Sequence, residues 1–189
     1  MDVRLHQRFT PHFSPYSGFT LLELLVTLVI IAILTGIGVP ALHTLIMNNR
    51  MSTQVNELMT AMQGARSQAI ARQQHVVLCP SANQSGCLNG NTWQMGWILF
   101  ADRNANKQLD QDEATLRVHS AASADLTITG SNGRQRIVLQ PDGTAGGSNA
   151  TFTFCDTRGP AQARAIIVAL NGRPRVARTK ADGTPLTCP

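Results

Sequence analysis

The sequence is poor in charged residues, in aromatic residues and in lysine. Charged residues make up 14% of the chain, below the usual share of about a quarter, and aromatic residues make up 5%. It contains no CxxC pair, phosphate-binding loop, GxGxxG motif or nucleophile elbow. These absences argue against a zinc site, a nucleotide site and a hydrolase, so we expect neither an enzyme nor a cofactor. Hydrophobic residues reach 43%, which excludes a chain that is disordered throughout.

What the sequence has in excess is arginine, and this excess lies late in the chain. Of the 16 basic residues, 14 are arginine, the residue suited to bidentate phosphate contact. Residues 131–189 contain eight basic and three acidic residues, a balance of +5, whereas residues 19–130 contain six basic and seven acidic ones. This asymmetry indicates a polyanionic partner, with a solvated basic face as the alternative.

An apolar run of 21 residues, Phe19–Val39, is long enough to cross the hydrocarbon core of a bilayer. Arg4 and Arg8 precede it, so the positive-inside rule predicts a cytoplasmic N-terminus. A cleaved secretory signal is the alternative, but the run is longer than a signal core. Its single charge, Glu23, costs ~2.5–3.5 kcal/mol near the membrane centre and therefore needs a partner. An amine released by cleavage just upstream is the best candidate.

The segment GFTLLELLVTLVIIAIL resembles the class III signal of type IV pilins and type II secretion pseudopilins. The resemblance implies that a prepilin peptidase removes a leader, residues 1–18, by cutting after Gly18. It also implies N-methylation of the new terminus, Phe19, and a role for Glu23 in docking the subunit onto its neighbour during assembly. The protein would then reside in the inner membrane with a periplasmic head, and reach the cell surface in a pilus or pseudopilus.

A helical apolar pattern continues beyond the membrane segment. It predicts one helix from Phe19 to about Gln73, with a transmembrane half, residues 19–47, and an amphipathic half, residues 48–74. Pro40 is a possible kink. The apolar stripe of the second half consists of Val55, Leu58, Met59, Met62, Ala65, Ala69 and Ile70.

The remainder, residues 75–189, reads as a β-rich head. Seven β-prone runs separated by Asn-Gly, Asp-Gly and Gly-Gly turns predict one or two antiparallel sheets packed on the helix, an α+β fold. The resemblance implies the same type IV pilin-like architecture. The runs are His75–Cys79, Trp93–Phe100, Leu116–His119, Leu126–Ile128, Arg136–Leu139, Thr151–Phe154 and Ala165–Leu170.

The four cysteines are an even number in a head that is expected to be exported, which indicates disulfides. Three pairings are possible. We favour Cys79–Cys87, which closes a local loop, and Cys155–Cys188, which ties the tail to a strand. A zinc site is the alternative that the missing CxxC and His clusters argue against.

Longer stretches point to one branch of the family. VNELMTAMQGARSQAIARQQHVVLC, TWQMGWILFADRNANKQLDQDEATLR and a late NGRPR resemble the GspH/FimT branch, which comprises a type II secretion pseudopilin and a minor pilin of type IV pili. FimT-type minor pilins of naturally competent bacteria carry a C-terminal GRxR motif associated with DNA binding and uptake. Gly172, Arg173 and Arg175 match that motif, and the resemblance implies DNA contact there.

The residues around this motif suggest the mode of DNA binding. Arg173 and Arg175 project to one face of an extended chain, and Pro174, which lacks an N–H, favours an edge or loop position. Few aromatic residues are interleaved, so we expect contact with the DNA backbone and little base readout. Arg178 and Lys180 join the site by proximity, and a second N-G-R-x-R unit makes Arg134 and Arg136 reserve candidates. Both units lead to a D-G-T turn, which we attribute to shared turn chemistry.

A further stretch has the oxygen spacing of an EF-hand loop, but lysine stands where that loop needs glycine, at position 107, and the flanks read as strands. A polar hairpin tip is the favoured interpretation, and calcium the weaker one. The candidate ligands are Asp102, Asn104, Asn106, Gln108, Asp110 and Glu113.

Two functions therefore remain open. The first is a minor pilin that binds DNA through its basic C-terminal region and supports DNA uptake in natural transformation. The second is a type II secretion pseudopilin or pilus-assembly subunit with a structural role, whose arginines bind neighbouring subunits. Expected partners are DNA, other pilin or pseudopilin subunits, the prepilin peptidase and the inner membrane. A calcium-stabilised tip adhesin is a third, weaker interpretation.

Overall fold

The computed structural model describes residues 18–131 and 134–189, so the predicted leader lies outside the described residues except for Gly18. The chain divides into two compact units, Met1–His43 and Thr44–Pro189. One helix, α1 (Leu21–Arg72), runs through both, close to the predicted 19–73. Thr20 caps it: its Oγ1 accepts a hydrogen bond from the Glu23 backbone N–H at 3.2 Å.

The first unit contains the apolar part of α1. Over an 18-residue window its mean hydropathy is 2.5 and none of the window is buried. By length and composition this is the one helix, among the described residues, that is able to cross a membrane. Exposed leucine, isoleucine and valine side chains cover it on all sides, as a lipid environment requires.

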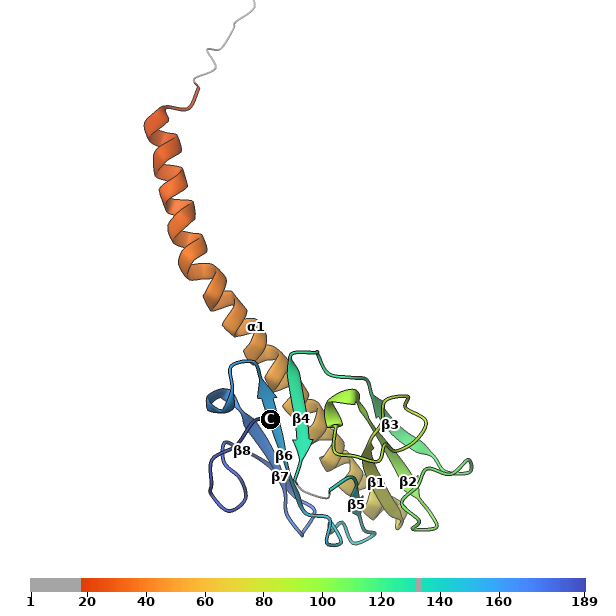
Figure 1. The fold of residues 1–189 in the computed structure, drawn as a ribbon. Helices are drawn as coiled ribbons and strands as arrows, with labels where there is room; N and C mark the ends of the chain where they lie inside the picture. Colours follow the sequence, from red (N-terminus) through yellow and green to blue (C-terminus); the bar gives the residue numbers. More distant parts are fainter. Residues whose placement is uncertain (1–17, 132–133) are drawn as a thin grey trace, which may run out of the picture. The chain divides into compact units, whose positions relative to one another are not determined.

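The second unit contains the head, in which the eight strands of the described residues form two four-stranded antiparallel sheets (Figure 1). The first sheet has the order β3-β2-β1-β5 and the second has the order β4-β6-β7-β8. The strands of the first are β1 (His75–Pro80), β2 (Trp97–Asp102), β3 (Thr115–His119) and β5 (Ile137–Leu139). Those of the second are β4 (Leu126–Gly130), β6 (Ala150–Asp156), β7 (Arg164–Val168) and β8 (Pro174–Ala177).

The expected α+β architecture is therefore present, with two differences from the predicted strands. Trp93–Met95 forms a short 3-10 helix, and the strand begins only at Trp97. Residues 174–177, which were expected to be extended but were not among the predicted strands, form β8 at the edge of the second sheet. Pro174, which cannot donate a backbone hydrogen bond, is tolerated there because only one side of β8 is paired.

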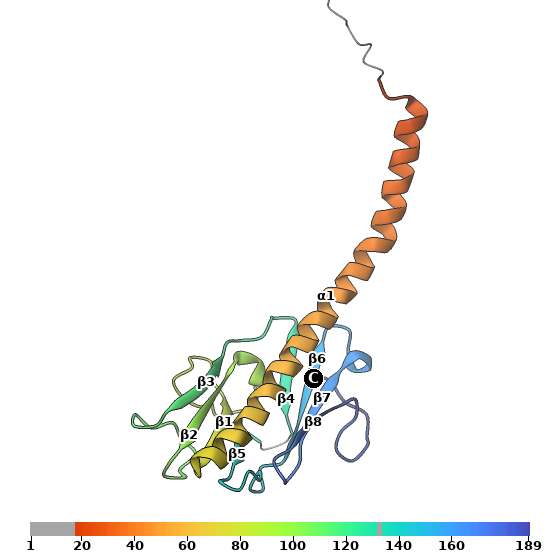
Figure 2. The same cartoon turned by 180° about the vertical axis from the view of Figure 1, so that it is seen from behind.

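The second half of α1 lies across one face of both sheets, as the view from behind shows (Figure 2). Its buried side chains recur every three or four residues, and those from Met51 to Ala69 pack with Trp93, Trp97, Phe152 and Phe154 in the main core. Five of the seven predicted stripe residues are buried, but Met59 is half-buried and Ile70 is 38% exposed. The buried helix residues are Met47, Met51, Val55, Leu58, Ala61, Met62, Ala65 and Ala69.

Two disulfides fasten loops to the outer faces of the sheets, with the pairing that the sequence favoured. Cys79–Cys87 spans eight residues and Cys155–Cys188 spans 33. The first packs beside Val77, Ile98 and Phe100, and the second holds the C-terminal tail over the outer face of the second sheet. By the chain-entropy relation, closing these loops stabilises the head by about 2.5 and 3.7 kcal/mol.

Candidate nucleic-acid interface

The GRxR motif occupies the hairpin between β7 and β8. The backbone N–H of Gly172 donates to Ala169 O at 2.9 Å, and that of Arg173 donates to Asn171 Oδ1 at 3.0 Å. Gly172 has a φ of +72°, the left-handed conformation that closes a three-residue hairpin loop. The Asn-Gly pair is therefore the turn, and the arginines begin where the turn ends.

Position 172 also requires glycine because the backbone of Gly143 lies close to it. A Cβ at this position would collide with the carbonyl oxygen of Gly143 and lie 3.1 Å from Leu139 Cδ1. The same carbonyl accepts a hydrogen bond from Arg66 Nε at 3.1 Å, and Gly143 in turn packs against Ile70. The glycine of the motif thus joins the β7–β8 turn to the turn that follows β5 and, through it, to the last turns of α1.

Arg173 and Arg175 are both exposed. Arg175 pairs with Ile167 of β7, whereas the neighbouring Ile166 and Val168 belong to the core beneath α1. Because side chains alternate along a strand and paired residues share a face, Arg175 lies on the outer face of the second sheet. Arg173 has the same parity, so the two arginines follow one another along that face.

The two cations added by proximity lie farther along the tail. Arg178 is exposed just after β8. Lys180 is half-buried and lines a hollow of about 690 Å³ over the outer face of the second sheet, beside Thr151, Thr153 and Asp182. Its backbone N–H donates to Thr184 O at 2.8 Å, so the Asp182-Gly183-Thr184 turn determines its position.

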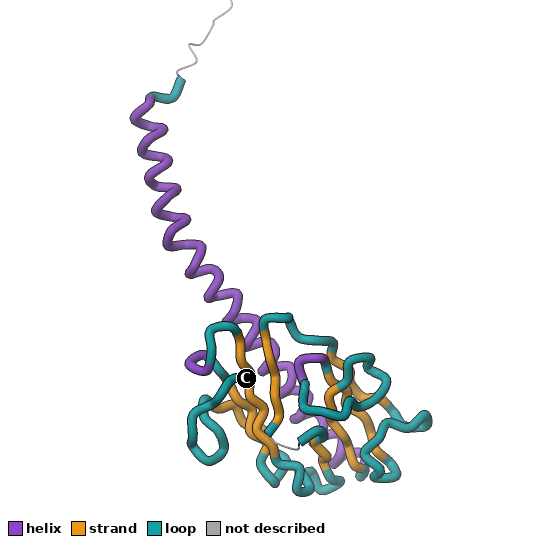
Figure 3. The backbone as a smooth tube through the Cα atoms, in the orientation of Figure 1, coloured by secondary structure: helices purple, strands orange, loops and turns teal. Residues whose placement is uncertain are grey.

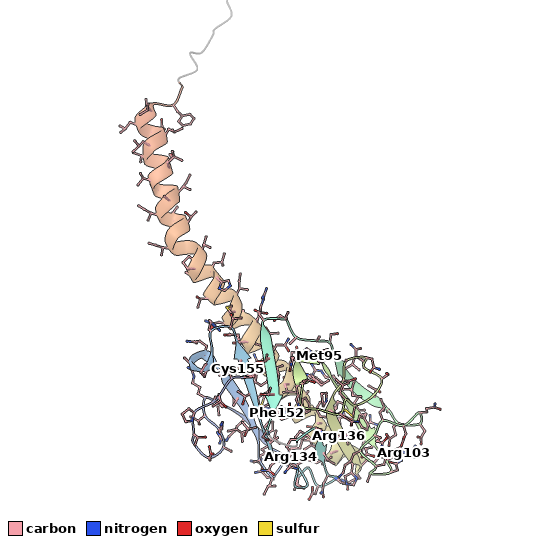
Figure 4. The ribbon with its side chains drawn as sticks, in the orientation of Figure 1. Met95, Arg103, Arg134, Arg136, Phe152 and Cys155 are labelled. Atoms are coloured by element: carbon pink, nitrogen blue, oxygen red, sulfur yellow. A yellow bond between two sulfur atoms is a disulfide. The ribbon has the colours of Figure 1, made fainter. Side chains whose placement is uncertain are left out.

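The reserve pair, Arg134 and Arg136, belongs to the first sheet rather than the second. Both are half-buried and lie in the segment that leads into β5, near one end of the head (Figure 4). They line a cleft of about 340 Å³ together with His75, Lys107 and Gly147. The described structure therefore separates the predicted cations into three groups: the β7–β8 hairpin, the tail, and the segment before β5.

The two D-G-T turns have the same hydrogen-bond pattern. The backbone N–H and the Oγ1 of Thr144 both donate to Asp142 Oδ1 at 2.8 Å, and Thr184 makes the equivalent bonds to Asp182 Oδ1 at 2.9 and 2.7 Å. These bonds lower the pKa of both carboxyl groups. The repeat is thus shared turn chemistry, as expected, and neither aspartate is engaged with an arginine of the motif.

Hydrogen bonding distinguishes the candidate cations from the arginines that fasten the head. Those that fasten the head to α1 or to itself have partners: Arg50 pairs with Asp125, Arg66 with Gly143 O, Arg117 with Glu57, and Arg158 with Asp156 and Asn48. The side chains of the candidate cations make no hydrogen bond or ion pair to any residue that the structure describes. They are Arg134, Arg136, Arg173, Arg175, Arg178 and Lys180.

Two side-chain donors are buried without a partner among the described residues: Trp93 Nε1, in the main core, and Arg136 Nε, from a residue that lines the cleft. A buried donor without an acceptor costs ~1–3 kcal/mol, so such a group marks a place where an acceptor belongs.

The candidate calcium ligands form a single loop between β2 and β3, so the predicted strand flanks are confirmed. Asp102 is fully buried, and its carboxylate accepts the backbone N–H groups of Asn106 at 3.1 Å and Lys107 at 3.0 Å. Lys107 has a φ of +65°, so this lysine adopts the conformation for which glycine is preferred. Lysine at position 107 therefore makes the loop conformation less favourable but does not prevent it.

The remaining members of this loop bond to one another. Two amide side chains donate to Asp110 Oδ2 at 2.8 Å, and Glu113 accepts the Arg103 backbone N–H at 2.7 Å. Gln108 is exposed, and its backbone N–H donates to Asn106 Oδ1 at 2.7 Å. Within the described ranges, 18–131 and 134–189, no three His, Cys, Asp or Glu side chains are grouped to hold a metal ion. Calcium binding therefore stays the weaker interpretation of this loop, and a polar hairpin tip the favoured one. The two amide donors belong to Asn104 and Asn106.

The comparisons with known proteins place the chain in a family. Residues 54–172 match the family described as type II transport protein GspH, and residues 14–39 match the prokaryotic N-terminal methylation motif. The chain belongs to the GspH family of minor pilins and pseudopilins, which are structural subunits and not enzymes. The methylation motif implies processing by a prepilin peptidase and assembly with other pilin subunits.

Particular relatives agree with this assignment. The pilin-like protein PilA1 of Thermus thermophilus is 29% identical over 84% of this chain and 97% of its own length. The fold matches the minor pilin FimU of Pseudomonas aeruginosa with a TM-score of 0.57 at 20% identity, covering 74% of this chain and 96% of FimU. It also matches the minor pseudopilin EpsH of Vibrio cholerae, with a TM-score of 0.50 at 9% identity over 68% and 96% of the two chains.

Proposed function

We propose that this chain is a minor pilin of a type IV pilus that binds the DNA backbone through its basic C-terminal region and supports DNA uptake. The observation that carries the proposal is the lack of partners around the β7–β8 hairpin. Arg175 lies in the edge strand β8 and Arg173 directly precedes it; both are exposed, and their side chains make no bond within the described chain. Arginines two residues apart on an extended chain are separated by about 6.6–6.8 Å. This is twice the axial spacing of about 3.4 Å between phosphates of one DNA strand, so the two side chains can contact separate phosphates.

The absence of aromatic side chains on this face supports backbone contact rather than base stacking. Trp93 and Trp97 are 1% and 2% exposed and belong to the core, so neither is available to a base. Phosphate contacts carry no sequence information, so duplexes of equal length and unrelated sequence should bind alike.

Fluorescence-anisotropy titration of duplex DNA with the full chain in non-ionic detergent, at several salt concentrations, tests the proposal. We expect weak binding, with a Kd of about 10⁻⁴–10⁻⁶ M. Arg173→Gln/Arg175→Gln should lower the log–log salt slope by about 1.4–1.8 on single-stranded or double-stranded DNA, because each lost phosphate contact removes about 0.7–0.9. The charge-matched control is Arg72→Gln/Arg103→Gln, which removes two exposed cations on the side of the first sheet.

The possible outcomes are distinct. Equal loss in the motif variant and the control would show non-specific charge attraction. Unchanged binding in the motif variant would remove Arg173 and Arg175 from the site. No binding by the wild type at low salt would favour the second candidate, a structural pseudopilin of a type II secretion system, which the description of the matching family also favours.

The processing sites and location belong to the same proposal. A prepilin peptidase cuts after Gly18, Phe19 becomes the methylated terminus, and Glu23 docks the subunit onto a neighbour. The subunit resides in the inner membrane with a cytoplasmic N-terminus and a periplasmic head until it enters the pilus. Mass spectrometry of the assembled subunit should find methylated Phe19 at its start; an intact Met1 would contradict this.

A further inference from the structure

The cleft before β5 is lined by three cations that have no partner in the described chain: Lys107, Arg134 and Arg136. They come from two segments distant in sequence, the β2–β3 loop and the lead into β5. Its volume of about 340 Å³ leaves room for a polyatomic anion. Figure 4 shows Arg134 and Arg136 at one end of the head, where Figure 3 shows a cluster of teal loops from both sheets.

Two glycines that line the cleft have backbone N–H groups without an acceptor in the described chain. These are Gly146 and Gly147, which have positive φ values of 50° and 78°. Successive free backbone N–H groups at such a turn are suited to an oxyanion. The turn is held in place because the Gln140 side chain packs on Gly146 and the Ser148 N–H donates to Ala145 O at 2.7 Å.

One carboxylate, Asp102, lines the same cleft and has to be counted against an anion. Both of its oxygens already accept backbone N–H groups, one each from Asn106 and Lys107. Counted without histidine, one negative and three positive side chains leave the lining with a formal balance of +2. Arg136 Nε adds a buried donor that has no acceptor among the described residues.

We propose that this cleft is a phosphate site, in which Lys107, Arg134 and Arg136 hold one phosphate group against the Gly146-Gly147 turn. The site goes beyond the proposed function because it needs no contact with the GRxR hairpin. The phosphate belongs either to a DNA strand or to a small phosphorylated molecule.

Equilibrium dialysis of the full chain in non-ionic detergent against radiolabelled inorganic phosphate tests the site. The wild type should bind phosphate saturably with one site per chain. Arg136→Gln and Arg134→Gln should each weaken binding by about tenfold or more, the effect of losing a charge-assisted hydrogen bond. Arg72→Gln, an exposed arginine that does not line the cleft, should bind as the wild type does. Arg136→Lys, which retains the charge, should recover part of the loss.

A second measurement guards against misfolded variants. At the same concentration, phosphate should raise the free energy of unfolding of the wild type more than that of Arg136→Gln, because stabilisation by a ligand falls as its Kd rises. Absence of saturable binding by the wild type, or equal loss in Arg72→Gln, would overturn the proposal.

Competition identifies the source of the phosphate group. Displacement of inorganic phosphate by an unphosphorylated duplex would assign the site to the DNA backbone. Displacement only by a 5′-phosphorylated oligonucleotide or a mononucleotide would assign it to terminal phosphates. The Arg173→Gln/Arg175→Gln variant should retain inorganic phosphate binding in either case, so failure of the hairpin as a DNA site and failure of the cleft are separate results.

Discussion

The glycine of the GRxR motif provides the sharpest test of the fold around the candidate interface. Gly172→Ala places a methyl group into the Gly143 carbonyl, which is held by Arg66 and by the main-chain bond from the Gly143 N–H to Gln140 O at 2.7 Å. A non-glycine residue at positive φ costs about 1–2 kcal/mol by itself. Forcing an extra methyl group into a packed contact costs about 1–3 kcal/mol more. The sum predicts a loss of ~2–5 kcal/mol.

Gly183→Ala is the matched control. Gly183 has a φ of +85° in the second D-G-T turn, and nothing lies within 4 Å of a Cβ built there. It should therefore lose only the conformational part, about 1–2 kcal/mol. Urea denaturation of both variants measures the difference, which we expect to be about 1–3 kcal/mol.

Equal destabilisation of the two variants would refute the close approach of Gly172 to Gly143. A DNA titration of the folded fraction completes the experiment. Because Gly172 positions the turn from which Arg173 begins, the variant should bind DNA more weakly than the Gly183→Ala control. Unchanged DNA binding would mean that the hairpin tolerates displacement.

Three further outcomes are expected. Cys155→Ser/Cys188→Ser should lower the free energy of unfolding by about 4 kcal/mol and expose the C-terminal tail to protease. An unchanged denaturation midpoint would contradict this role of the disulfide. Burial lowers the pKa of His119 in the folded head. The contribution of His119 to stability is therefore complete above about pH 6.5, the pKa of an unfolded histidine, and is lost as the pH falls below that value. His119→Gln should flatten the fall in the free energy of unfolding between about pH 7 and pH 5. Glu23→Ala should leave the denaturation profile of the head unchanged but abolish incorporation into pili, and normal incorporation in a pilus preparation would refute the docking role.

Local patterns predicted the helix because its signals are local. The apolar run Phe19–Val39 marks its first half, and the apolar stripe from Val55 to Ala69 repeats with helical spacing in its second half. The helical pattern placed Ile70 in the buried stripe, and this was wrong because its side chain is exposed. Ile70 lies on the last turn and packs against Gly143, a contact set by the distant turn after β5 and invisible to helical periodicity.

The strand β8 was missed for a related reason. Its residues, Pro174-Arg175-Val176-Ala177, have neither strict alternation nor a run of β-branched residues, and proline opens the strand. Tertiary pairing overrides this weak propensity, because β7 presents a complete partner from Ala165 to Val168. The disulfides were predicted more easily, since Cys79 and Cys87 are close in sequence and leave one natural partner for each remaining cysteine.

The net charge of residues 131–189 counts arginines that are already paired within the head together with arginines that are unpaired in the described chain. Residues 131–189 contain eight basic residues, but Arg158 is held by three hydrogen bonds to the Asp156 carboxylate and one to Asn48, and this raises the pKa of the arginine and lowers that of the aspartate. Binding DNA through Arg158 would require breaking a half-buried ion pair that ties β6 to α1. The motif arginines break nothing when they bind a phosphate, since they have no partner in the described chain. In the sequence every arginine carries the same charge. The structure separates the arginines that hold the head together from those that are free to bind an anion. Only the second set can contribute to anion affinity without a loss of stability.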